Sequence, residues 1–183
     1  MNTQEHKTIS KQLSYVLRHR PDTIGVVLED GGWVLVDDLL RALERNGKAI
    51  SLQTLQQVVA ESDKQRYEFS DDALRIRARQ GHSADVDLGY PPAVPPDLLY
   101  HGTATKNMTS ILQQGLLKGR RHHVHLSTNK ETMLQVAMRH GVPVLLEIDA
   151  ARMSADGHLF YVTGNQVWLT DHVPPRYLTV ATS

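Results

Sequence analysis

The sequence predicts an α+β protein of two lobes, and three observations lead to this prediction. Residues 1–85 carry apolar positions at helical spacing, followed by one hairpin pattern. Residues 98–183 carry short apolar runs of strand length with helical patterns between them. Residues 86–97 (VDLGYPPAVPPD) are rich in proline, a composition typical of a semi-rigid linker. We therefore expect an N-terminal lobe, a linker and a C-terminal lobe with these bounds.

Composition excludes several classes of function. Lys and Arg number 20, Asp and Glu also number 20, and the formal net charge is zero. No general basic field attracts nucleic acid, so a polyanion site must be a local cluster. The absence of cysteine excludes disulfides and Cys-based zinc sites. Without an apolar leader or a run of 18 apolar residues, we expect a cytoplasmic protein with no membrane association.

The first helix is predicted by apolar residues at i, i+4, i+7 and i+8: Ile9, Leu13, Val16 and Leu17. Pro21 ends it. Arg18 lies opposite the apolar stripe and His19 on its flank, so the core needs neither residue. Cations at a helix C-terminus are also stabilised by about 0.3 to 1 kcal/mol. At this point a purely structural role for Arg18 and His19 stays open.

Two short strands at 26–28 and 33–36 and two helices capped by Asp37 and Ser51 are expected next. A hairpin follows, with apolar residues on one face and mostly arginine on the other: Tyr67, Phe69, Ile76 and Ala78 against Arg66, Glu68, Arg75, Arg77 and Arg79. Helices followed by such a hairpin predict a winged-helix module, whose wing commonly contacts nucleic-acid backbone. An ordinary solvated arginine face is the alternative.

In the C-terminal lobe, a strand from Leu98 leads into His101-Gly102-Thr103, and later helices end at Gly115 and begin at a Thr128 cap. Further strands are expected at 142–148, 159–162, 166–169 and 177–180. The stretch 118–127 (KGRRHHVHLS) is the most unusual, because it joins a basic loop to an alternating strand. Alternation places His123 and His125 on one face, which predicts anionic chemistry there. A solvated basic loop is the alternative.

The known catalytic signatures are missing: there is no Walker loop, GxGxxG, HExxH or GxSxG. His101, His123 and His125 lack a nearby thiol or carboxylate to complete a zinc site, so no metal is expected. What remains is Arg, His, Gly, Thr and Ser at the ends of strands and helices. This set binds phosphate and stabilises negative charge but supplies no nucleophile. In an enzyme of this kind the substrate would bring its own nucleophile.

Six segments carry these residues in a fixed order: Leu17-Arg18-His19 with Pro21; Asp63-Lys64-Gln65-Arg66-Tyr67; residues 77–83 (RARQGHS); Tyr100-His101-Gly102-Thr103; residues 121–127 (RHHVHLS); and residues 165–170 with Val173-Pro174-Pro175 and Tyr177. Together they resemble the motifs of the RNA 2′-phosphotransferases, which remove a splice-junction 2′-phosphate from tRNA with NAD. The resemblance covers almost the whole chain.

The resemblance implies a winged-helix lobe that holds RNA and an ADP-ribosyltransferase-like lobe, with a split β-sheet, that holds NAD. It implies a catalytic set, which falls on Arg18, His19, Arg66 and Arg121. It also implies an NAD-binding set: His101, Gly102, Thr103, His125 and Ser127. Arg120, His82 and Ser83 are further candidates for contact with the substrate phosphate. Arg121 is chosen over Arg120 by its spacing to His123-Val124-His125, and a supporting structural role is the alternative for His82.

The implied reaction has two steps. The RNA 2′-phosphate attacks the nicotinamide ribose and releases nicotinamide, and the ADP-ribosylated RNA then yields 2′-OH RNA and ADP-ribose 1″,2″-cyclic phosphate. Partners would be a tRNA-like RNA with a 2′-phosphate and no obligate protein. Gln166-Val167-Trp168 lacks the glutamate that protein-modifying relatives place on a late strand, which disfavours a protein target. An ADP-ribosyltransferase acting on terminal phosphates and a non-catalytic winged-helix regulator are the alternatives.

Overall fold

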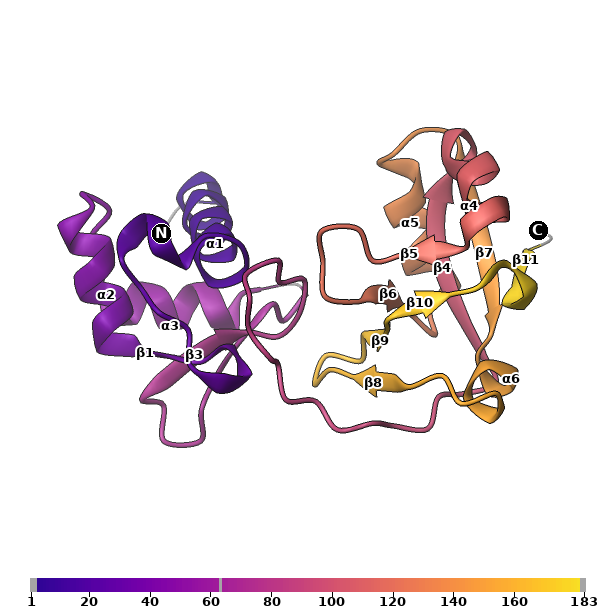
Figure 1. Ribbon diagram of the computed structural model, residues 1–183. Coiled ribbons are helices and arrows are strands. Elements are labelled where there is room, and N and C mark those ends of the chain that lie inside the picture. The colour runs from indigo at the N-terminus through magenta and orange to yellow at the C-terminus, as the bar shows by residue number, and fades with distance from the viewer. Residues whose placement is uncertain (1–2, 63, 182–183) are drawn as a thin grey trace. The chain divides into compact units, whose positions relative to one another are not determined.

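The computed structural model describes residues 3–62 and 64–181, and its chain divides into two units, Met1–Gly89 and Tyr90–Ser183 (Figure 1). The division falls inside the proline-rich segment 86–97. Several small antiparallel sheets occur together with helices, which confirms the α+β class. Asp63, the first residue of the second motif, lies outside the described residues. None of the described helices is both long and apolar enough to cross a membrane.

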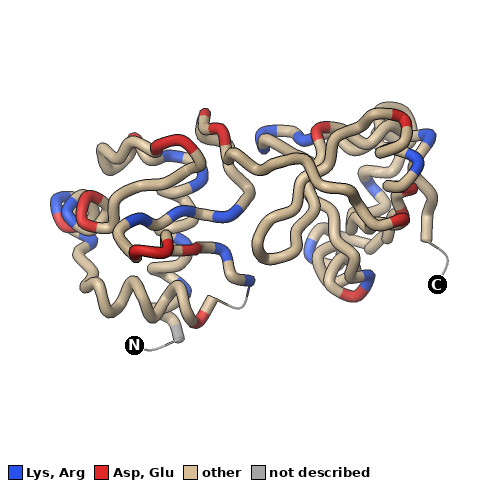
Figure 2. The backbone as a smooth tube through the Cα atoms, turned by 90° about the horizontal axis from the view of Figure 1, so that it is seen from below, with Lys and Arg blue, Asp and Glu red and all other residues tan. Residues whose placement is uncertain are grey.

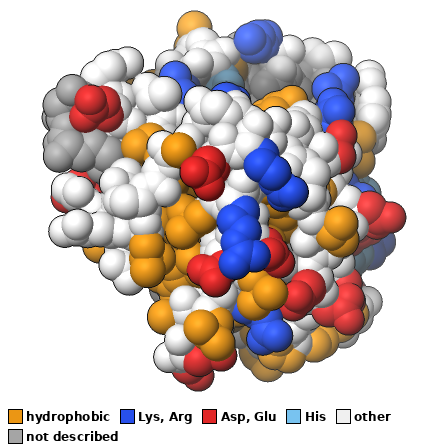
Figure 3. Space-filling model, turned by 90° about the vertical axis from the view of Figure 1, so that its left-hand side faces the viewer, with side chains coloured by type: hydrophobic (Ala, Val, Ile, Leu, Met, Phe, Trp, Pro, Cys, Tyr) orange, Lys and Arg blue, Asp and Glu red, His pale blue; other side chains and the backbone are white. Residues whose placement is uncertain are grey.

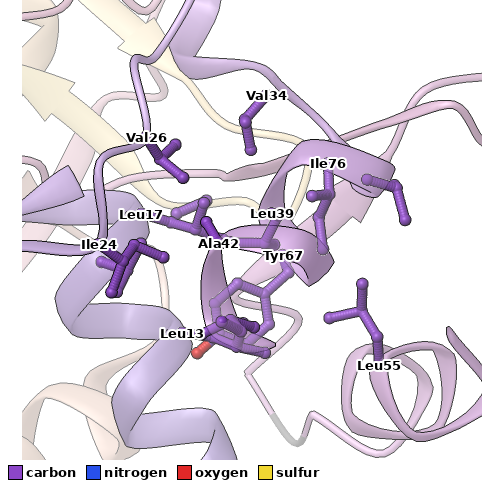
Figure 4. Close-up of a cluster of buried hydrophobic side chains, with 14 of the residues drawn as sticks. Leu13, Leu17, Ile24, Val26, Val34, Leu39, Ala42, Leu55, Tyr67 and Ile76 are labelled. Atoms are coloured by element: carbon purple, nitrogen blue, oxygen red, sulfur yellow. The ribbon is translucent and has the colours of Figure 1, made fainter. Parts of the chain in front are cut away.

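The described residues of the N-terminal unit form three α-helices and one sheet. The helices are α1 (Thr3–Arg18), α2 (Val36–Arg45) and α3 (Leu52–Ala60), with short 3-10 turns at Pro21–Ile24 and Asp30–Gly32. The strands β1 (Val34–Leu35), β2 (Tyr67–Phe69) and β3 (Arg75–Ala78) form an antiparallel sheet in the order β1-β3-β2. The apolar stripe of α1 and the apolar face of the hairpin meet in one core (Figure 4).

Tyr67 ties the hairpin to α1. Its ring is buried in the core, and its hydroxyl donates to the carbonyl of Ser10 at 2.5 Å and lies 2.7 Å from the Ser14 hydroxyl. A buried phenol is stabilised when its hydroxyl finds such partners. The residue next to Arg66 is therefore fixed directly to α1.

Local expectations in this unit had mixed outcomes. The Ser51 cap is confirmed, because its side chain accepts from the Thr54 backbone N–H. The Asp37 cap was wrong: α2 begins at Val36 with Leu35 in the N-cap position, and Asp37 lies in its first turn, where a carboxylate is still favourable. The strand at 26–28 was also wrong, since the chain there leaves the turn at Pro21–Ile24 in an irregular conformation.

Up to residue 181, the C-terminal unit contains two three-stranded antiparallel sheets. One has the order β11-β7-β4 and consists of β4 (Leu98–Ala104), β7 (Pro143–Asp149) and β11 (Leu178–Val180). The other has the order β6-β9-β8 and consists of β6 (Val124–Leu126), β8 (Phe160–Val162) and β9 (Trp168–Thr170). A bridge between Tyr100 and Ser127 connects β4 to the end of β6. A two-stranded pair, β5 (Leu116–Leu117) and β10 (His172–Val173), completes the strands.

Three helices accompany these sheets: α4 (Met108–Gln114), α5 (Lys130–Met138) and α6 (Ala150–Ala155), with short 3-10 turns at Thr105–Asn107 and Pro175–Tyr177. The expected Thr128 cap was wrong, because the side chain of Asn129 accepts from the Thr132 N–H and begins α5. Helix α5 approaches β4 so closely that a Cβ added at Gly102 would lie 1.9 Å from the Met133 carbonyl oxygen.

Candidate active site

Arg18 and His19 lie where α1 ends, and a later segment of the chain fastens them. The Arg18 carbonyl accepts from the backbone N–H groups of Ser83 and Ala84, at 2.8 and 3.0 Å. The His19 Nδ1 lies 2.9 Å from the Ser83 hydroxyl. His19 is exposed, and the Nε and Nη2 atoms of Arg18 are buried. The motif 77–83 therefore holds the end of the helix that carries two candidate catalytic residues.

His82 and Ser83 are neighbours with different surroundings. The His82 side chain is fully buried, and its Nε2 lies 3.3 Å from where a Cβ on Gly32 would be. A buried ring of this kind favours the supporting role over contact with a phosphate. Ser83 is exposed and bonded to His19. No pattern in the sequence predicts that bond, because the two residues are far apart in the chain.

Arg66 lies at the base of the hairpin. Its N–H donates to the Ser62 hydroxyl at 3.2 Å, and its carbonyl accepts from the Arg79 N–H at 3.0 Å. The other hairpin arginines have carboxylate partners: Arg75 pairs with Glu29, and Arg77 and Arg79 pair with Glu68. Among the described residues no carboxylate forms an ion pair with Arg66. Its guanidinium is thus the one on this hairpin best suited to a bound anion.

In the C-terminal unit, Arg121, His125 and His101 form a hydrogen-bonded chain. The Arg121 Nη1 lies 3.3 Å from the His125 Nδ1. A guanidinium only donates, so Nδ1 accepts and the proton of neutral His125 is on Nε2. The His125 carbonyl accepts from the His101 Nδ1 at 3.0 Å, which leaves the His101 Nε2 as the unprotonated nitrogen of the neutral ring.

Burial lowers the pKa of His101, and the positive charge of Arg121 and the side chain of His140 act in the same direction. The hydrogen bond to the His125 carbonyl raises the pKa, but this effect is smaller than that of burial. His101 is therefore neutral near pH 7. Arg120 is exposed and, within the described part of the chain, forms no hydrogen bond through its side chain. The geometry thus connects Arg121, rather than Arg120, to the histidines.

The remaining candidates have clear structural roles. Gly102 faces α5, and the buried Thr103 accepts from the Asn107 side-chain amide at 3.2 Å. The Ser127 backbone pairs with Tyr100 in both directions, and its hydroxyl accepts from the Asn129 N–H at 3.0 Å. These contacts shape the strand ends around His101 and His125.

Positive and negative residues occur together in both units. Lys and Arg are interspersed with Asp and Glu along the chain (Figure 2). In the described residues no group of three or more His, Cys, Asp or Glu side chains is arranged to hold a metal ion. The functional groups of the candidate site are guanidinium and imidazole groups, which can orient anions and transfer protons.

Comparison with known proteins places these residues in a family. The model of the family described as "RNA 2'-phosphotransferase, Tpt1 / KptA family" matches residues 4–172. A protein of Agrobacterium fabrum named "Probable RNA 2'-phosphotransferase" is 54% identical over 172 residues, which cover 94% of this chain and 92% of the relative. One of Acaryochloris marina with the same name is 48% identical over 174 residues, covering 95% and 96%. The chain therefore belongs to the RNA 2′-phosphotransferase, Tpt1 / KptA family, and is an enzyme of the transferase class.

Proposed function

We propose that this chain removes an internal 2′-phosphate from a tRNA-like RNA in the cytoplasm, with NAD consumed as a co-substrate. The observation that carries the proposal is the hydrogen-bonded chain of Arg121, His125 and His101, which lies within two of the motifs that resemble the family. It joins a cation suited to phosphate to a neutral imidazole suited to a dinucleotide.

The N-terminal unit is assigned to RNA. Its element order, with α2 and α3 between β1 and the β2–β3 hairpin, and its sheet order β1-β3-β2 support a winged helix. The C-terminal unit is assigned to NAD. Its two separate antiparallel sheets, joined by the bridge from Tyr100 to Ser127, support a split-sheet, ADP-ribosyltransferase-like lobe. The proline-rich segment 86–97 is the linker between the two lobes.

The residues of the C-terminal unit fit NAD by the chemistry of their donors and acceptors. NAD supplies a ribose carbon from which nicotinamide leaves. His101 offers an unprotonated Nε2, His125 an Nε2–H donor and Ser127 a hydroxyl. Gly102 and Thr103 would form the wall behind these three side chains, because Gly102 packs on α5 and Thr103 is buried.

In the first step an oxygen of the RNA 2′-phosphate forms a bond to the ribose C1″ as the bond to nicotinamide breaks. A phosphate is already anionic and needs orientation more than deprotonation. Arg18, Arg66 and Arg121 would orient it by charge-assisted hydrogen bonds, the contribution that guanidinium groups make best.

In the second step the ribose 2″-oxygen attacks the phosphorus, and the bond from phosphorus to the RNA 2′-oxygen breaks. The proton lost by the 2″-hydroxyl must reach the leaving 2′-oxygen, and His19 is assigned to carry it. Negative charge grows on the phosphoryl oxygens, where the same arginines stabilise it. The products are 2′-OH RNA and ADP-ribose 1″,2″-cyclic phosphate.

One incubation tests the proposal. A 2′-phosphorylated oligoribonucleotide is mixed with the protein and NAD, and nicotinamide and the RNA product are followed together. We expect one nicotinamide released for each 2′-OH RNA formed. A stable ADP-ribosylated RNA with no cyclic phosphate would instead support terminal-phosphate ADP-ribosylation, and RNA binding that is indifferent to NAD would support a non-catalytic regulator.

The variant His19→Ala is expected to accumulate the ADP-ribosylated RNA intermediate, because only the second step needs proton transfer. Ser83→Ala should show a weaker form of the same accumulation, since it removes the hydroxyl that orients the imidazole, while Ser83→Thr keeps the hydroxyl. Rapid-quench sampling of the RNA measures the intermediate. Equal loss of both steps in His19→Ala would remove its second-step role.

Folding stability is expected to depend on the protonation of His101. Its pKa is lowered in the folded protein, so below about pH 6.5 the unfolded chain binds the proton more readily. Stability should therefore fall as pH falls through that value, by at most about 1.4 kcal/mol per pH unit from this group. Urea unfolding at pH 7.5 and 5.5 should show a smaller difference in His101→Asn than in the wild type. An identical difference would contradict the prediction.

A further inference from the structure

We propose that a hollow beside α1 binds the RNA strand next to the 2′-phosphorylated nucleotide, with Tyr15 as a stacking platform and Lys11 and Lys48 as phosphate contacts. The proposal deepens the proposed function, because it concerns how the same RNA is held. The hollow has a volume of about 370 Å³ and lies in the N-terminal unit. The lining includes Lys11, Tyr15, Val16, Ile24 and Lys48.

The charge of this hollow distinguishes it from the two others described on the same unit. One of those is lined by Asp37 and Glu44 together with Arg41, and the second includes Glu5. Figure 3 shows the same mixture of signs on one face of the molecule, with positive and negative side chains lying side by side. The hollow beside α1 has two lysines and no carboxylate in its lining. Of the three, it alone suits a phosphate backbone.

Its shape suits a nucleobase as well. Tyr15 is a large aromatic residue that remains 49% exposed, while Val16 and Ile24 beside it are buried and close the floor. An exposed ring over an apolar floor, with ammonium groups at its edge, is how proteins hold single-stranded RNA without reading its sequence. The carboxylate of the adjacent Asp22 is paired with Arg20 at 2.8 Å, which offsets its repulsion of a phosphate.

Two residues that line the hollow, Lys11 and Tyr15, lie on the same helix as Arg18, the residue before His19. Lys11, Tyr15 and His19 follow one another at i, i+4 and i+8, and all three are exposed. The helical hydrogen bonding still includes His19, whose N–H donates to the Tyr15 carbonyl at 3.0 Å. Residues at this spacing share one face of a helix and span about 12 Å along its axis. A strand whose 2′-phosphate lies at His19 would thus pass Tyr15 and then Lys11.

Binding of fluorescein-labelled RNA in the absence of NAD tests this site. The probes are a trinucleotide with a central 2′-phosphate and two eight-nucleotide RNAs that carry the phosphate near the 5′ or the 3′ end. Tyr15→Ala should weaken the binding of one of the two long RNAs by about 5- to 100-fold, the range expected for one stacked base. The affinity for the trinucleotide should not change. Tyr15→Phe should bind like the wild type. Lys48→Ala should reduce the slope of log affinity against log salt concentration by about 0.7, the contribution of one phosphate contact on a single strand.

Arg41→Ala, in the hollow lined by Asp37 and Glu44, is the matched control and should change nothing. The proposal would be overturned if Tyr15→Ala bound both long RNAs as tightly as the wild type does. It would also be overturned if the variant lost the same affinity for the long RNAs as for the trinucleotide. This test is independent of the test of the proposed reaction. If the protein binds the long RNA through Tyr15 but releases no nicotinamide, the RNA site is supported and the proposed reaction is contradicted.

Discussion

Replacing Arg121 with alanine is expected to lower kcat by about 10²- to 10³-fold while the protein folds normally, the effect of losing one donor from a preorganised anion site. Arg121 is exposed, so its removal leaves no cavity, and its only described side-chain bond is to His125. Single-turnover rates on a 2′-phosphorylated RNA measure the loss, and a thermal unfolding curve checks the fold. Arg66→Ala should behave in the same way.

Arg120→Ala is the matched control, because it removes the same charge one residue away. Its side chain has no described hydrogen bond, so we expect activity within a few-fold of the wild type. If Arg120→Ala lost as much activity as Arg121→Ala, the two arginines would share the role. Near-native turnover of Arg121→Ala with a large loss in Arg120→Ala would move the assignment to Arg120.

The second large effect is expected from Gly102→Ala, which should destabilise the C-terminal unit by more than about 3 kcal/mol or prevent it from folding. The added methyl group would lie 1.9 Å from the Met133 carbonyl oxygen and 3.1 Å from the Ala137 nitrogen, both in the backbone of α5. Backbone atoms of a packed helix cannot move aside as a flexible side chain can. Urea unfolding measured by circular dichroism reports the change.

Gly157→Ala is the control for Gly102→Ala. A Cβ at Gly157 would meet no atom within 4 Å, and the cost there comes only from its positive φ of 92°. We expect about 1 kcal/mol for this backbone effect. If Gly102→Ala were as stable as the wild type and only bound NAD more weakly, the glycine would serve the ligand and not the contact with α5.

The main helices and strands could be predicted because their apolar periodicity is long enough to be unambiguous. The stripe on α1 and the alternation of the β2–β3 hairpin are examples. Short elements could not: α6 has six residues, and β5 and β10 have two each. At the start of α5, Thr128 and Asn129 are both good capping residues, and only the path of the chain decides between them.

The candidate site shows a similar limit. Residue types and their resemblance to a family selected Arg121 and His125, and the structure bonds them to each other. The pairing of His19 with Ser83 depends on how the chain returns to α1, which no local pattern encodes. Gly102 was expected to be part of the NAD-binding set, whereas its observed neighbour is the backbone of α5.

The phenol of Tyr67 bears on the speed of the proposed reaction. It anchors the strand that follows Arg66 to Ser10 and Ser14, one to two turns before Arg18 on the same helix. The backbone segments that carry Arg18 and Arg66 are thus joined during folding, before any RNA arrives. If both arginines act on one phosphate as proposed, the entropy of bringing these segments together is lost once, during folding, and not again in each catalytic cycle.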